Sequence, residues 1–262
     1  AKKICKCNKE LEEPRQGDVY ADSDYIVYQD GMYQIHVYDR KKKTFVKIKG
    51  IPETNMYLSG LVGKYFILSS KPYKEKGKEK YAFSYYKIGS DQIHIMDPAC
   101  YTSAAAIGDK KRKQVIYALR KGIWTYDLKQ DKKKRLVKWN KKDYVSEMCI
   151  RKDRLFVFTG EKDEVYSYSL TGKEKQLHYE KELTETLKKF EQQNDLELVI
   201  DSVDVVNNKI CIHSWQDDEY LIYLCYDPAT KQLKKVRKSD PEMLYFLLCR
   251  DGASVDEWDR DE

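Results

Sequence analysis

Short apolar segments recur along the chain at nearly regular intervals, and each is followed by a turn and a second, alternating segment. Their first residues lie 40, 49, 40 and 55 positions apart, close to the roughly 40–50 residues of a four-stranded propeller blade. The two longer intervals contain a polar insert at 71–80 and a segment with helical periodicity at 182–195. The pattern therefore predicts an all-β protein, a single β-propeller with one short helical insert. The apolar segments begin at Tyr25, Tyr65, Gln114, Arg154 and Lys209.

The segment after each turn alternates as a half-buried strand does and ends in a tyrosine, often as Tyr-Asp. A Lys-rich turn and a short fourth strand follow. Because the tyrosine recurs once per unit, we expect it to be a packing position. The tyrosines concerned are Tyr38, Tyr126, Tyr168 and Tyr226.

The predicted units leave fragments at both ends of the chain, residues 1–8 and residues 241–262. An open ring of blades would expose two strand edges, which favour aggregation. We therefore expect the two terminal fragments to share a last blade, which makes six blades, with five or seven as alternatives. The five predicted units cover residues 18–50, 56–98, 101–140, 144–180 and 196–238.

The predicted helix carries Leu183, Leu187 and Phe190 on one stripe. We expect this stripe to dock on the propeller itself. Counting of up-and-down strands places this insert and the insert at 71–80 at the same end of the propeller, opposite to the Lys-rich turns. Binding loops usually gather on one face of a repeat scaffold, so we expect a ligand at the end with the inserts.

Composition narrows the class of protein further. Charged residues make up 35% of the chain and the formal net charge is +6, and no apolar run approaches the roughly 20 residues that span a bilayer. We therefore expect no membrane span. Seven cysteines, an odd number, with only Cys5 and Cys7 close together, favour buried reduced thiols over a disulfide framework or a metal site.

Motifs for catalysis, cofactors or metals are lacking in this sequence. The four histidines fall in different units without metal-ligand spacing, and there is no nucleophile elbow or Gly-rich phosphate loop. We therefore assign no catalytic, cofactor-binding or metal-binding residue. Acidic residues near the predicted innermost strands could line the channel, and we take Glu147 and Asp201 as the candidate ligand-binding residues.

The Tyr-Asp unit with its Lys-rich turn and following Leu, seen in 126–136 and 226–233, resembles that of bacterial secreted propellers related to the low-density-lipoprotein-receptor-type propeller. The resemblance covers most of the chain, but its motif is structural and transfers no catalytic residue. The segment Ile123-Trp124-Thr125-Tyr126-Asp127 only approximates the receptor signature Tyr-Trp-Thr-Asp. The resemblance implies a bacterial, extracytoplasmic protein, secreted or lipoprotein-like at the cell surface, and implies no ligand.

These observations predict a non-enzymatic, extracytoplasmic binding propeller. We expect a monomer that binds a protein or a glycan, and no nucleic acid. Two alternatives stay open. One is a glycan-acting enzyme that uses carboxylates in the channel, because glycoside hydrolysis needs two such groups. The other is polyanion binding through the Lys-rich turns, since phosphate contacts are largely charge-driven.

Overall fold

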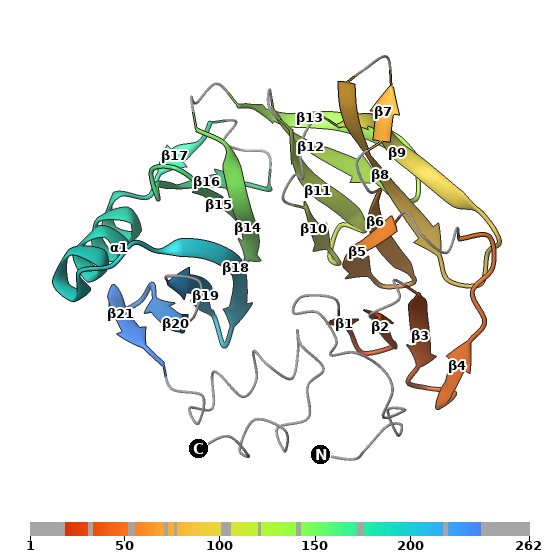
Figure 1. The fold of residues 1–262 in the computed structure, drawn as a ribbon, viewed down its shortest axis with the longest axis horizontal. Coiled ribbons are helices and arrows are strands. Elements are labelled where there is room, and N and C mark those ends of the chain that lie inside the picture. The colour runs from red at the N-terminus through yellow and green to blue at the C-terminus, as the bar shows by residue number, and fades with distance from the viewer. Residues whose placement is uncertain are drawn as a thin grey trace. The chain divides into compact units, whose positions relative to one another are not determined.

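The computed structural model describes most of the chain and contains antiparallel sheets and a single described helix (Figure 1). The described residues form two compact units, one within residues 19–99 and one within 100–236. They comprise residues 19–30, 34–51, 56–70, 73–75, 78–100, 106–119, 122–139, 143–171, 176–216 and 220–236.

The first unit contains two sheets, which we call blades 1 and 2. Blade 1 has four antiparallel strands in sequence order, β1 (Val19–Ala21), β2 (Tyr25–Gln29), β3 (Ile35–Asp39) and β4 (Thr44–Val46). In blade 2 the strands β5, β6, β8 and β9 pair in succession, while β7 pairs with the start of β8. The polar insert predicted at 71–80 therefore contributes a hairpin to this blade. These strands are β5 (Met56–Val62), β6 (Tyr65–Ser70), β7 (Tyr73–Glu75), β8 (Lys78–Lys87) and β9 (Ile93–Cys100).

The second unit contains three four-stranded sheets, blades 3, 4 and 5, each with its strands in sequence order. Blade 3 consists of β10 (Ala106–Asp109), β11 (Gln114–Leu119), β12 (Gly122–Asp127) and β13 (Lys132–Lys138). Blade 4 consists of β14 (Val145–Arg151), β15 (Arg154–Thr159), β16 (Val165–Ser169) and β17 (His178–Tyr179). Blade 5 consists of β18 (Val199–Val206), β19 (Lys209–Gln216), β20 (Tyr220–Asp227) and β21 (Gln232–Lys235).

The helix α1 (Lys181–Asn194) lies between blades 4 and 5 in the sequence, one residue from the predicted bounds at each end. Leu183 and Leu187 are buried in the same apolar core as residues of both blades, and Phe190 is partly buried against it. The predicted apolar stripe is therefore confirmed, and it packs on the protein's own sheets. Within the described residues, no helix is long and apolar enough to cross a membrane.

The recurring tyrosine pairs with the second residue of the preceding strand in every described blade, so the predicted repeat register is confirmed. Blade 2 supplies Tyr86, a further member that the sequence analysis did not identify. Four of the five rings are buried, and Tyr38 is half-buried. Burial of a ring at a fixed position explains why the unit retains it.

The aspartate that follows this tyrosine caps the next turn. Asp39, Asp127 and Asp227 each accept hydrogen bonds from backbone N–H groups of that turn. The turns also place Lys43, Asp131 and Lys231 at φ 56°, 55° and 59°. A short side chain that accepts backbone N–H groups stabilises such a turn, so the Tyr-Asp motif is structural.

A β-bulge recurs in the first strand of three blades. The pairing register shifts between Leu58 and Gly60, between Val145 and Glu147, and between Ile200 and Ser202. The extra residues are Ser59 in β5, Ser146 in β14 and Asp201 in β18. The bulges of β14 and β18 lie at equivalent positions, opposite the fifth and sixth residues of the next strand, whereas the bulge of β5 lies opposite the third and fourth. Bulges bend a strand and redirect its side chains, and their recurrence is a feature of the repeat that the sequence pattern did not show.

The described strands form five blades rather than the six that we expected. Their bounds agree with the five predicted units, and the all-β class with one helix is confirmed. The expected sixth blade falls on residues 1–8 and 241–262, which lie outside the described residues. Closure by the two termini therefore stays a prediction.

Candidate functional site

Helix α1 is held at its N-terminal half by contacts to two blades. The Val165 N–H donates to Thr184 Oγ1 at 3.0 Å, and Thr184 is fully buried. Glu182 forms an ion pair of 2.5 Å with Lys231 in the turn between β20 and β21. Strand counting placed the helix at the end opposite to the Lys-rich turns, yet its first turn contacts one of them. These contacts fix the position of α1 within the second unit.

The C-terminal end of α1 is unusually acidic. The helix ends at Asn194, and the capping residue Asp195 adopts the left-handed conformation at φ 52° and donates its N–H to the Glu191 carbonyl. The Leu198 N–H donates to Glu191 Oε1 at 2.9 Å, and no basic residue lies in the last turn. Since the C-terminus of a helix carries partial negative charge, the acidic side chains here add to that charge instead of balancing it.

A loop at 160–164, between β15 and β16, faces this end of the helix. The buried carboxylate of Asp143 holds the loop by accepting hydrogen bonds from the N–H groups of Glu161 and Lys162, both at 3.0 Å. Gly160 lies under the ring of Tyr144, and a Cβ there would be 2.1 Å from that ring. A side chain at position 160 would therefore displace the Tyr144 ring, and the loop presents Asp163 at φ 50°.

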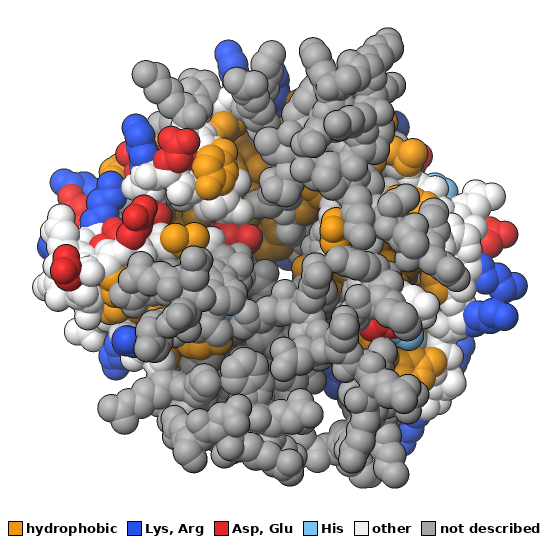
Figure 2. All heavy atoms as spheres, viewed as in Figure 1, with side chains coloured by type: hydrophobic (Ala, Val, Ile, Leu, Met, Phe, Trp, Pro, Cys, Tyr) orange, Lys and Arg blue, Asp and Glu red, His pale blue; other side chains and the backbone are white. Residues whose placement is uncertain are grey.

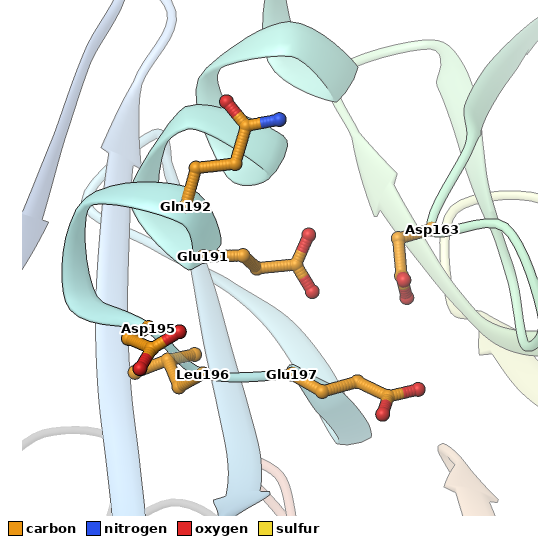
Figure 3. Close-up of a pocket in the computed structure, with 6 residues that line it drawn as sticks. All are labelled: Asp163, Glu191, Gln192, Asp195, Leu196 and Glu197. Carbon is orange, nitrogen blue, oxygen red and sulfur yellow. The ribbon is translucent and has the colours of Figure 1, made fainter.

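Together the loop and the helix end form an open pocket of about 490 Å³. Figure 3 shows Glu191 extending from α1 toward Asp163, with the carboxyl group of Glu197 on the same side. Over the region of α1 as a whole, Figure 2 shows acidic and basic side chains intermixed. In the pocket, by contrast, four of the six lining residues are acidic. It is lined by Asp163, Glu191, Gln192, Asp195, Leu196 and Glu197.

Asp163 responds strongly to this environment. Partial burial, followed by the negative charge of Glu191, raises its pKa from 3.8 to about 7. The charges of Glu197 and Asp143 contribute to this increase in the pKa, and Lys188 opposes it. A carboxyl group with a pKa near neutrality gains or loses its proton in the physiological range. A cation in the pocket would favour the ionised form, so cation binding and proton release are coupled here.

The two candidate residues from the sequence lie on the first strands of blades 4 and 5, and neither is among the residues that line this pocket. Glu147 is half-buried in β14 opposite Phe158, directly after the bulge residue Ser146. Asp201 is itself the bulge residue of β18. The position in β18 that corresponds to Glu147 is Ser202, so the two acids occupy successive positions of the repeat instead of matching ones. Their role in ligand binding stays a prediction.

Some cations of the Lys-rich turns are already engaged. Lys111 and Arg112 form ion pairs of 2.8 and 2.6 Å with Asp153 of the neighbouring blade, and Arg112 also pairs with Asp109. Lys133 lies 4.3 Å from the centre of the Trp124 ring. Because these contacts use the charges to join turns and strands within the protein, they favour a structural role for this part of the cationic surface.

Asp163, Glu191 and Glu197 are not among the candidate residues that the sequence suggested. The acidic run at the end of a predicted helix, with no Lys or Arg in its last turn, was visible in the sequence. The acidic end of α1 lies beside a loop almost 30 positions earlier in the chain because of how the helix packs on the blades. The spacing of apolar residues does not predict this packing. Among the residues that the structure describes, no cluster of three His, Cys, Asp or Glu side chains is arranged to hold a metal ion.

Comparisons with known proteins identify the fold. No protein-family model matches the sequence, and no curated protein matches it. Among solved structures, a nidogen–laminin complex matches with a TM-score of 0.53 at 11% identity, over 86% of this chain and 79% of that chain. The extracellular domain of a putative one-component system from B. thetaiotaomicron matches at 0.50 and 14% identity, over 84% of this chain and 28% of that chain.

A structure from an analysis of two prolyl endopeptidases matches with a TM-score of 0.54 at 13% identity, over 88% of this chain and 36% of that chain. At these identities the comparisons describe the fold. Together with the repeated four-stranded sheets, they define this chain as a β-propeller, as the sequence predicted. Membership in the bacterial secreted family that its Tyr-Asp repeat resembles stays a prediction.

Proposed function

We propose that this chain is a non-enzymatic binding propeller that acts outside the cytoplasm and binds a basic segment of a protein partner at the acidic pocket beside α1. The observation that carries the proposal is the meeting of Asp163, Glu191 and Glu197 in one open pocket, where the pKa of Asp163 rises to about 7. Like charges held together raise the free energy of the unbound site, and a cationic ligand relieves that cost.

The surroundings of the pocket also favour a protein ligand. Tyr144, over the loop that carries Asp163, is 58% exposed, and Val199, two residues after Glu197, is 59% exposed. Exposed apolar side chains near a charged pocket are typical of a protein-binding surface. The proposed ligand therefore combines Lys or Arg with neighbouring apolar side chains.

The location outside the cytoplasm rests on the resemblance of the Tyr-Asp repeat to secreted propellers. Two of the similar folds come from a nidogen–laminin complex and from an extracellular domain, which supports the same location. We further propose that residues 1–8 and 241–262 pair in a sixth blade. A deletion of residues 1–8 should then lower the melting temperature, and an unchanged melting temperature would contradict this pairing.

Peptide binding tests the proposed function. A Lys-rich peptide with two apolar residues should bind the wild-type chain more tightly at pH 8 than at pH 6, because Asp163 is ionised at the higher pH. A peptide with Gln in place of each Lys should bind at least about tenfold more weakly, a difference of 1.4 kcal/mol. Calorimetry in two buffers of different ionisation enthalpy should also detect release of a proton on binding. Equal binding of the two peptides would contradict the proposal.

A further inference from the structure

Two cysteines lie directly opposite each other in blade 5. In the pairing of β19 with β20, Cys211 is the partner of Cys225, and their Sγ atoms are 3.6 Å apart. Opposite residues in antiparallel strands have Cα atoms about 4.5 or 5.5 Å apart. Both values fall within the roughly 4.4–6.8 Å that disulfides span. Side-chain rotation can therefore bring the two sulfur atoms into bonding distance without moving the strands.

The neighbourhood of the pair suits a covalent link. Both cysteines belong to a small apolar cluster with Val206 and Tyr223, and each cysteine is 6% exposed. By contrast Cys149, in β14, is fully buried in a different cluster. The Cys211 thiol donates a hydrogen bond to the Cys225 sulfur, and this bond, together with burial and the charge of Asp204, raises the pKa of Cys211. The reduced pair is therefore expected to react slowly but in the correct geometry.

We propose that Cys211 and Cys225 form a cross-strand disulfide when the folded chain meets a disulfide-bearing oxidant. One cysteine, as the thiolate, attacks a sulfur of the oxidant and expels a thiolate, which takes up a proton. The second cysteine then loses its proton and attacks the mixed disulfide, which releases a second thiol. Two cysteine thiols are thereby oxidised, and one small-molecule disulfide is reduced to two thiols.

This disulfide would join two strands of one hairpin and close a short loop in the unfolded chain, which favours the folded state. Its formation does not depend on the acidic pocket. It does not require the proposed location either, although an oxidising compartment would supply the oxidant. Cys149, Cys211 and Cys225 are free and buried, as the sequence predicted for the cysteines, and the proposal concerns what the last two become in the presence of an oxidant.

Peptide mapping tests the pairing directly. The full chain is equilibrated with excess oxidised glutathione under native conditions, alkylated in denaturant and digested with trypsin. Residues 210–231 contain no Lys or Arg before Lys231, so both cysteines fall in one tryptic peptide. We expect this peptide to be lighter by two hydrogens and to take up no alkylating reagent. Two alkyl groups, or a glutathione adduct on one cysteine, would overturn the proposal.

A stability measurement adds a readout that does not depend on digestion. The oxidised wild-type chain should melt several degrees above the reduced chain. The control variant Cys149→Ala should retain this difference even if its own melting temperature is lower. The variants Cys211→Ala and Cys225→Ala should each lose the difference. If Cys211→Ala retained it, the stabilising disulfide would involve other cysteines and the proposal would be wrong.

Discussion

Two kinds of connection in the second unit handle charge in opposite ways. In the Lys-rich turns, opposite charges meet: Lys111 and Arg112, between β10 and β11, pair with Asp153, and Lys231, between β20 and β21, pairs with Glu182. Between the 160–164 loop and the end of α1, carboxyl groups meet one another, and the pKa of Asp163 rises to about 7. Charges that are balanced within the protein serve the fold, whereas charges of one sign held together provide a reason to bind a partner.

The largest expected effect concerns the packing beneath a capped turn. Tyr126 is buried, and its hydroxyl donates to Asp131 in that turn at 2.6 Å. Tyr126→Ala should lower the free energy of unfolding by about 4 kcal/mol, the size usual for a buried aromatic ring. The half-buried equivalent Tyr38 provides the matched comparison, and Tyr38→Ala should cost about half as much. Urea unfolding measures both, and a larger loss at Tyr38 would show that burial does not set the effect.

The next prediction compares two aspartates that each accept backbone N–H groups, one beside the 160–164 loop and one in a Lys-rich turn. Asp143 is buried and accepts three backbone N–H groups, from Tyr144, Glu161 and Lys162. Asp143→Ala should cost about 3 kcal/mol, because these donors lose their acceptor in a buried site. Asp127→Ala, in a more exposed turn, should cost about 1 kcal/mol. Urea unfolding of the two variants side by side tests the difference, and equal losses would contradict it.

A smaller effect should appear at Asp163, with a distinct dependence on pH. Its pKa is raised from 3.8 to about 7, so between these values the folded chain holds a proton that the unfolded chain releases. The free energy of unfolding therefore falls as pH rises through this window. Asp163→Asn removes the cost and should stabilise the protein at pH 8 by about 1 kcal/mol, after allowance for partial exposure.

The stabilisation by Asp163→Asn should shrink toward pH 4, where the carboxyl group of the wild type is protonated in the folded state and partly protonated in the unfolded state. Asparagine also tolerates the left-handed backbone at this position, so the substitution tests charge more than conformation. Melting curves at pH 4, 6 and 8 measure the trend. A stabilisation that stays constant over this range would show that the charge of Asp163 is not its cause.

The smallest effect is expected where charges are balanced at the surface. Lys111 pairs with Asp153 in an exposed position, so Lys111→Ala should change the free energy of unfolding by less than about 0.5 kcal/mol. Binding of the Lys-rich peptide should be unaffected. A loss well above this size would show that the pair between the turns carries more of the stability than its exposure indicates.

The fold was predictable because its signals are local and repeated. Apolar segments, Lys-rich turns and the Tyr-Asp pair recur at the spacing of a blade, and the apolar stripe of α1 is visible within one segment. The bulges at Ser59, Ser146 and Asp201 were not predictable, since a bulge depends on pairing across strands and leaves no periodic signal. Residues 1–8 and 241–262 lie outside the described part of the chain, so their predicted pairing stays untested.

The candidate site was less predictable than the fold. Glu147 and Asp201 were chosen from their place on first strands, but the pocket forms where α1 and the 160–164 loop meet. The cysteine pair was within reach of sequence reasoning. Once Ile210 is placed opposite Tyr226 by the repeat register, Cys211 falls opposite Cys225. The number and spacing of the cysteines along the chain do not show this pairing, because it depends on the register between the two strands.

The central claim is that the acidic pocket binds a cationic segment, and one titration tests it most directly. The double variant Asp163→Asn/Glu197→Gln should bind the Lys-rich peptide about tenfold more weakly than the wild type at pH 8, a loss of 1.4 kcal/mol, and should lose the dependence on pH between 6 and 8. The control variant Glu185→Gln removes an exposed charge from α1 outside the pocket lining and should bind as the wild type does. Equal affinity of the double variant and the wild type at pH 8 would contradict the claim.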